Sequence, residues 1–143
     1  MGVAASSKNS AKNVKKGEDM KKLLMTLLAS LLLNGSAWAE WVKISEHGNG
    51  VFYIDPTTLR KDDNLRRIWR ITDLKKPFEG AQSFRSRVEY DCKNERSKML
   101  YFSSHSAPMA GGETLGSNNR EDEWEAVPPN TVSEDVLKFV CSQ

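Results

Sequence analysis

The feature that most constrains the fold is an alternation of side chains between residues 84 and 92. One side of an extended chain would carry Phe84, Ser86, Val88, Tyr90 and Cys92, and the other side Arg85, Arg87, Glu89 and Asp91. A period of two over this length predicts a half-buried antiparallel strand. The chain therefore has to build a sheet around this segment.

Further strands are predicted where short apolar or alternating segments are bounded by turn-forming residues. These segments span 41–44, 51–54, 65–71, 98–103 and, more briefly, 121–125. Gly48-Asn49-Gly50 would join the first two as a hairpin, and Lys93-Asn94-Glu95 would join the alternating strand to 98–103. The glycine-rich stretch 107–119 is expected to form a long loop.

The end of the chain carries the signals of a helix. Thr131 followed by Glu134 forms a capping-box pattern. The residues that would share one apolar face are Val136, Leu137, Val140 and Cys141. Strands followed by a helix predict an α+β domain, with an antiparallel sheet of about five to six strands and one packed C-terminal helix.

The N-terminal segment has the features of an export signal. Met20-Lys21-Lys22 precedes the apolar run 23–33, and Ala37-Trp38-Ala39 fits a cleavage site. This order is typical of a secretory signal peptide. We expect an N-terminal extension and signal peptide over 1–39, with its core at 20–39 and cleavage after Ala39. Translation is expected to start at Met20, although Met1 stays open. The mature domain 40–143 is expected in the periplasm or secreted, without a membrane span.

Export changes the interpretation of the two cysteines. In an oxidising compartment Cys92 and Cys141 would most simply pair, and the predicted helix brings Cys141 near the sheet. A reactive thiol and a redox pair are the alternatives. A redox pair usually has the spacing Cys-x-x-Cys, which this chain lacks.

Charge is distributed unevenly along the chain. The formal net charge is +2, but residues 40–143 alone carry 15 basic and 17 acidic side chains. Residues 60–98 have a net charge of +5, and residues 99–143 have a net charge of −5. The candidate binding residues are Arg66, Arg67, Arg70, Arg85, Arg87 and Trp124. Either the arginines form a basic sheet face for an acidic glycan or a protein, or they are ordinary solvated residues.

A family resemblance rests on an ordered set of residues in the mature chain. The set comprises Trp41-x-x-Ile44, Tyr53-Ile54-Asp55, Ile68-Trp69, Glu89-Tyr90-Asp91-Cys92 and Val140-Cys141. This order resembles the small secreted bacterial proteins grouped with surface-adhesin protein E. The resemblance implies an antiparallel sheet with a packed C-terminal helix, a Cys92–Cys141 bridge and a periplasmic or surface role. It also suggests binding of host matrix proteins such as vitronectin and laminin.

The residues give little support for catalysis or metal binding. Ser103, Ser104 and Ser106 flank His105, but no Gly-x-Ser-x-Gly pattern is present. We interpret His105 as a solvated loop residue, and Asp55 and Asp91 as turn-forming residues. Trp41 and Trp69 are expected in the core. We expect no catalytic site, no metal and no cofactor.

The sequence as a whole favours an exported, non-enzymatic binding module of the bacterial envelope. Its partner would be an extracellular or periplasmic protein, or an acidic glycan. The alternative is a small periplasmic structural or inhibitor-like protein without a host ligand. Nucleic-acid binding is not expected, because the mature domain is acidic and lacks a nucleic-acid-binding motif. The oligomeric state does not follow from the sequence.

Overall fold

The computed structural model describes residues 15–25 and 39–143, which fall into two separate units. In the first unit residues 15–25 form a helix, which the predicted fold class did not include. Most of the apolar run 23–33, and Ala37 and Trp38 of the cleavage pattern, lie outside the described residues. None of the described helices combines the length and apolar character needed to cross a bilayer.

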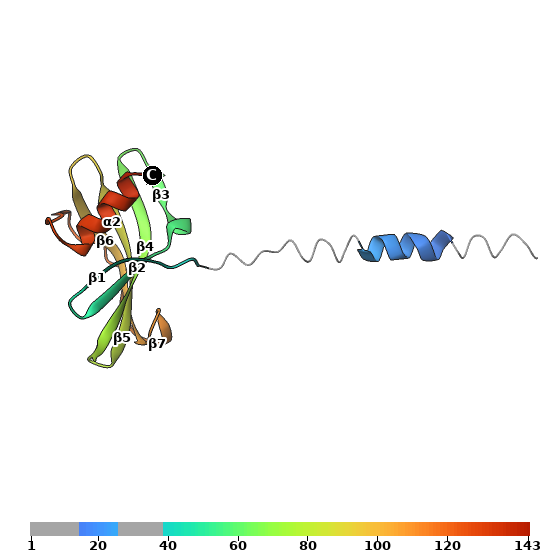
Figure 1. Cartoon of the computed structure of the whole chain (residues 1–143), viewed down its shortest axis with the longest axis horizontal. Coiled ribbons are helices and arrows are strands. Elements are labelled where there is room, and N and C mark those ends of the chain that lie inside the picture. The colour runs from blue at the N-terminus through green and yellow to red at the C-terminus, as the bar shows by residue number, and fades with distance from the viewer. Residues whose placement is uncertain (1–14, 26–38) are drawn as a thin grey trace, which may run out of the picture. The chain divides into compact units, whose positions relative to one another are not determined.

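The second unit, residues 39–143, is built on one antiparallel sheet (Figure 1). Its strands are β1 (Val42–His47), β2 (Gly50–Ile54), β3 (Arg60–Asp62), β4 (Leu65–Phe78), β5 (Ala81–Asp91), β6 (Arg96–Ala107), β7 (Gly111–Asn118) and β8 (Glu125–Ala126). The main order is β1-β2-β4-β5-β6-β7, with β3 paired to β4 and β8 paired to β6. The predicted antiparallel sheet is confirmed.

The predicted number of strands was too low. The sheet of residues 39–143 has eight strands, because β3 and β7 were not expected. The predicted strand at 121–125 overlaps β8 only at Glu125. β3 pairs with the start of β4 around a turn at residues 63–64. Three residues are too few to show a hydrophobic period, so this strand carries no sequence signal.

The predicted loop at 107–119 was wrong in most of its length. Residues 111–118 form β7, which pairs with β6 from Phe102 to Ala107. Gly112 adopts φ +68, and a Cβ there would lie 2.4 Å from the Ser106 hydroxyl oxygen. Only glycine fits this tight turn, so the glycines that suggested a loop are the residues that allow the hairpin.

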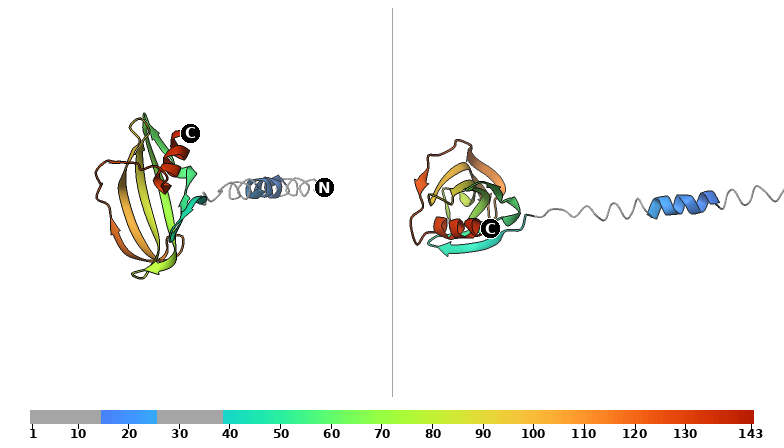
Figure 2. Two further views of the ribbon diagram at one scale, coloured as in Figure 1. Left: turned by 60° about the vertical axis from the view of Figure 1, so that its left-hand side comes forward. Right: turned by 90° about the horizontal axis from the view of Figure 1, so that it is seen from above.

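The C-terminal helix α2 (Val132–Cys141) follows the prediction closely. The Thr131 hydroxyl accepts a hydrogen bond from the Glu134 amide, and the Glu134 carboxylate accepts one from the Asn130 amide. Val136, Leu137 and Val140 are buried against the sheet. Figure 2 shows α2 packed against one face of the curved sheet.

The core lies between α2 and the face of the sheet that we call the helix-side face. This face contributes the buried residues Ile54, Ile68, Val88 and Tyr90 from β2, β4 and β5. Burying side chains of this size stabilises the fold by about 1.5–3 kcal/mol each. The predicted tryptophans are not part of this buried cluster: Trp41 and Trp69 are only half-buried.

A disulfide bond joins Cys92, just after β5, to Cys141 at the end of α2, with the two Cα atoms 5.7 Å apart. The predicted pairing is confirmed, and the described residues contain no free cysteine. The bond ties the helix to the sheet that it covers.

Candidate binding surface

The register of the central strands determines which candidate residues share a face. Directly paired residues of antiparallel strands point to the same side. Trp69 of β4 pairs with Arg87 of β5, and Arg87 pairs with Tyr101 of β6. The neighbouring rows are Arg67–Glu89–Lys98 and Ile71–Arg85–Ser103. All three rows lie opposite the helix-side face.

We call this surface the arginine face and define it by Arg67, Trp69, Arg85, Arg87 and Tyr101. Its aromatic centre is a contact between the rings of Trp69 and Tyr101, whose centroids are 5.4 Å apart in an edge-to-face arrangement. The Arg85 guanidinium lies 4.3 Å from the centroid of the Trp69 ring. Such cation–π contacts hold a guanidinium in place without neutralising it.

The arginines of this face differ in whether a carboxylate neutralises them. Arg67 Nε donates to the buried Glu89 carboxylate at 2.5 Å, and Lys98 pairs with the same carboxylate at 3.3 Å. Arg85 and Arg87 have no ion pair with any described residue. Arg85 Nε is also buried without a hydrogen-bond partner among the described residues. Two guanidinium charges on this face are therefore not neutralised by a carboxylate of the described residues.

A cavity of about 290 Å³ opens beside Arg87. Its lining is Thr58, Arg60, Arg67, Ile68, Trp69 and Arg87. Arg60 Nη1 donates to the carbonyl oxygens of Thr57 and Leu59, and its guanidinium has no carboxylate partner in residues 39–143. The cavity combines an aromatic wall with unneutralised guanidinium groups, which is the chemistry that binds sulfate, phosphate or carboxylate groups.

The structure does not place all the candidate arginines together. Arg66 pairs with Tyr90 and Arg70 pairs with Ser86, so both belong to the helix-side face. Arg66 Nη1 donates to the carbonyl oxygens of Asp63 and Leu65. The hypothesis of one basic face was wrong for these two residues, because successive side chains of a strand point to opposite sides.

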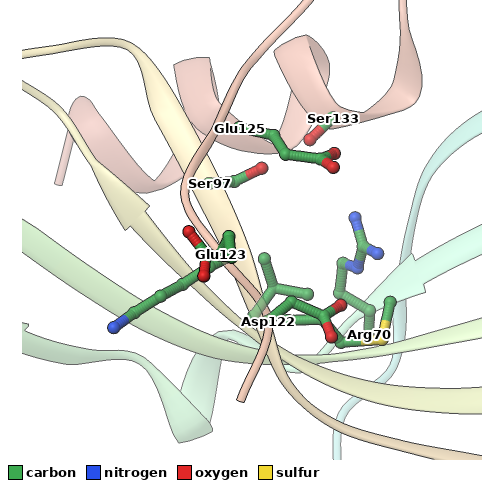
Figure 3. Close-up of a pocket in the computed structure, with 9 residues that line it drawn as sticks. Arg70, Ser97, Asp122, Glu123, Glu125 and Ser133 are labelled. Carbon is green, nitrogen blue, oxygen red and sulfur yellow. The ribbon is translucent and has the colours of Figure 1, made fainter.

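Arg70 instead reaches a small pocket of about 120 Å³ between β4, β6 and the segment that leads into α2 (Figure 3). Its guanidinium donates to the Tyr90 hydroxyl at 3.0 Å and to the Ser86 hydroxyl at 3.4 Å. The other labelled lining residues in Figure 3 are Ser97, Asp122, Glu123, Glu125 and Ser133. The three carboxylates make the pocket net acidic, so it does not extend the arginine face.

Trp124 is the remaining candidate. It is half-buried, with the Arg96 guanidinium 4.7 Å and the Lys98 ammonium 4.6 Å from its ring centroid. Two cations of the same domain already contact this ring. Trp124 therefore attaches the acidic segment 121–125 to β6, and it does not adjoin the cavity beside Arg87.

His105 lies in β6 and is only 8% exposed, so its interpretation as a solvated loop residue was wrong. Its Nε2 is 2.8 Å from the Ser103 hydroxyl, while its Nδ1 is buried without a hydrogen-bond partner in the described residues. Burial lowers the pKa of His105, and the nearby Arg85 charge lowers it further. Ser103 is 1% exposed, so this pair cannot reach a substrate in solution.

The two aspartates have structural roles, as predicted. Asp55 accepts hydrogen bonds from the Thr57 amide and hydroxyl, and it caps the short helix η1 (Pro56–Thr58). Asp91 accepts from the Asn94 side chain and from Arg96, and these contacts hold its pKa near 2. The described residues contain no cluster of three or more groups that could hold a metal ion.

Sequence reasoning missed the aromatic part of the arginine face. Trp69 was assigned to the core, and Tyr101 was not singled out. The alternation within β4 and β5 does place residues 67, 69, 85 and 87 in two outward sets. Only the register between the strands shows that these sets form one surface.

Fold and site together define a class of protein: a small disulfide-linked α+β module whose sheet presents one face rich in arginine and aromatic residues. The family model for surface-adhesin protein E matches residues 41–142. The chain therefore belongs to the surface-adhesin protein E family. A search of curated proteins gave no match.

Solved structures of Haemophilus influenzae protein E have the same fold. Crystal form II of that protein gives a TM-score of 0.60 at 14% identity, over 71% of this chain and 87% of that chain. Protein E from non-typeable Haemophilus influenzae gives 0.59 at 14% identity, over 76% of this chain and 79% of that chain. At these identities the likeness is evidence for the fold alone.

Proposed function

We propose that the chain is an exported, non-enzymatic binding module that holds an acidic partner on its arginine face. The observation that carries this proposal is the pair Arg85 and Arg87, which have no carboxylate partner among the described residues and flank Trp69 on one sheet face. Charge-assisted hydrogen bonds from such groups contribute about 1.5–3 kcal/mol each. The partner is an acidic glycan or an acidic segment of an extracellular or periplasmic protein, including a host matrix protein.

The absence of catalysis is part of the proposal. The pair of a serine hydroxyl and a histidine at Ser103 and His105 is buried in the sheet, and its histidine has a lowered pKa. A catalytic pair has to contact its substrate. Binding on the surface needs only the exposed edges of the guanidinium groups and the aromatic rings.

Heparin chromatography tests the binding, because heparin is a dense polyanion. We expect the purified protein to be retained at low ionic strength and to elute as salt rises. Arg85→Gln combined with Arg87→Gln should weaken heparin affinity at least about tenfold, because two charge-assisted contacts are lost. Arg85→Lys with Arg87→Lys should restore part of it, since lysine keeps the charge but not the planar fork.

The matched control is Lys61→Gln combined with Lys93→Gln. Both lysines are exposed and lie outside the arginine face, and the change in net charge is the same. We expect this variant to elute close to the unmodified protein. If both glutamine variants lost retention equally, heparin binding would depend only on net charge. That result would contradict specific binding on the arginine face.

Export is a separate part of the proposal and has its own test. The pattern Ala37-Trp38-Ala39 predicts a mature protein that begins at Glu40 and is found in the periplasm or outside the cell. Cell fractionation with N-terminal sequencing measures both properties. Full-length protein confined to the cytoplasm would contradict export, and protease protection in intact cells would exclude a surface role.

A further inference from the structure

The helix-side face is covered only in part. α2 packs on Ile54, Ile68, Val88 and Tyr90. Figure 1 shows that β7 and the far end of β5 lie at the other end of the sheet, away from α2. At that end the rings of Phe84 and Phe102 lie 5.3 Å apart, and both are only half-buried.

The uncovered part contains the most exposed large apolar side chains of residues 39–143. Phe78 is 60% exposed and Leu115 is 48% exposed. Both line one hollow of about 400 Å³, together with Glu79, Ala81, Phe84, Phe102 and Ser104. Contiguous exposed apolar groups of this kind indicate an interaction site.

The hollow opens beside a free sheet edge. β7 is the last strand in the sheet order, and residues 112–118 are exposed. Edge strands are usually protected by lysines, prolines or inward charges. β7 has a single charged residue, Glu113, and no proline. Its unpaired backbone groups can therefore accept another strand.

Gly116 connects this edge to the hollow. Phe84 pairs with Ser104, and Ser104 pairs with Gly116. Across these three strands the side chains therefore become smaller toward the edge, from phenylalanine through serine to glycine. A Cβ at Gly116 would lie 3.6 Å from the Ser104 hydroxyl oxygen, an ordinary contact, and Gly116 does not have a positive φ. The fold therefore does not require glycine at this position. Because Gly116 has no side chain, a group at the β7 edge could extend over Ser104 and contact Phe84.

We propose that β7 is a docking edge for an extended segment of another protein. The added strand pairs with β7 and places an aromatic side chain opposite Gly116, where it lies over Ser104 and contacts Phe84. Aromatic side chains stabilise cross-strand glycine in this way, and strand addition gains specificity from alternate side-chain pockets.

Two observations define the occupant further. Glu79 lines the hollow and Glu113 lies on β7, and neither has an ion pair in the described part of the chain, so the segment carries a basic residue near its aromatic one. A second copy of this chain fits less well, because its own β7 would bring one leucine and no aromatic side chain. This site lies on the opposite face from the arginine face and does not depend on it.

The test uses the blocked peptide Lys-Thr-Thr-Phe-Thr-Thr-Lys, with a control in which alanine replaces phenylalanine. Binding is followed by NMR titration and by hydrogen exchange of the β7 amides in the full chain. We expect saturable binding of the first peptide, at least tenfold weaker binding of the control, and slower exchange along β7. Absence of saturable binding up to millimolar peptide, or binding without protection of β7, would overturn the proposal.

Variants of β7 identify the position of the aromatic side chain. Gly116→Val fills the path and should weaken peptide binding at least tenfold without loss of folding, since the site tolerates a side chain. Thr114→Val is the matched control, because Thr114 pairs with His105 and so belongs to the other face. Equal binding by Gly116→Val would contradict the proposal. A dimer in solution that Leu115→Lys dissociates would assign the edge to a second copy and would also overturn it.

Discussion

Arg85 of the arginine face interacts with two neighbouring side chains, Trp69 and His105. The Arg85 guanidinium lies over the Trp69 ring, and burial together with the Arg85 charge lowers the pKa of His105. A protonated His105 would place a second positive charge beside Arg85. The lowered pKa of His105 therefore disfavours that second charge.

This arrangement predicts a pH dependence of stability. The pKa of His105 is below its ordinary value of 6.5 in the folded protein, so the unfolded chain binds the proton first as the pH falls. The stability that depends on neutral His105 is present above pH 6.5 and decreases below it. Urea unfolding at several pH values between 7.5 and 5 should show this decrease. His105→Gln should flatten the curve in that range, and an equal slope in the variant would contradict the prediction.

The structural roles of some residues could be predicted from the sequence, whereas those of others could not. The roles of Asp55 and of the Thr131 cap follow from short-range patterns, because their partners lie within three residues. The burial of Glu89 does not, since its partners Arg67 and Lys98 come from neighbouring strands. Alternation predicted a solvated position for Glu89, and long-range ion pairs made it a buried one.

At the scale of elements, the same distinction separates β5 from β7. β5 can be predicted from its period of two, because its apolar side chains contact α2. β7 has almost no buried side chains, so its sequence carries no hydrophobic period, and pairing with β6 alone makes it a strand. Strands of this kind cannot be predicted from hydrophobic periodicity.

The disulfide bond predicts how firmly α2 is attached. Cys92 and Cys141 are 49 residues apart, and a cross-link over a loop of this length stabilises a fold by about 4 kcal/mol. Replacing both cysteines by serine should lower the free energy of unfolding by about this amount and speed amide exchange in α2. Thr131→Ala, which removes only the helix cap, should cost about 1 kcal/mol. A double-serine variant no less stable than Thr131→Ala would contradict a tethering role.

At the scale of the whole molecule, the sheet presents two distinct surfaces. One face is covered by α2 at one end and leaves an apolar hollow beside β7 at the other. The opposite face carries Arg67, Arg85 and Arg87, while Trp124 attaches the acidic segment 121–125 to β6. Positive charge that no carboxylate neutralises attracts anionic groups to a surface.

An NMR titration of the protein with a heparin-derived tetrasaccharide tests directly whether the arginine face binds a polyanion. We expect saturable shifts of the Trp69 indole N–H and of the Arg85 and Arg87 guanidinium signals, with α2 unaffected. The shifts should weaken as salt rises, because ion pairs at a half-exposed surface are screened. Saturable binding that leaves Trp69 unshifted, or no binding at low ionic strength, would contradict it.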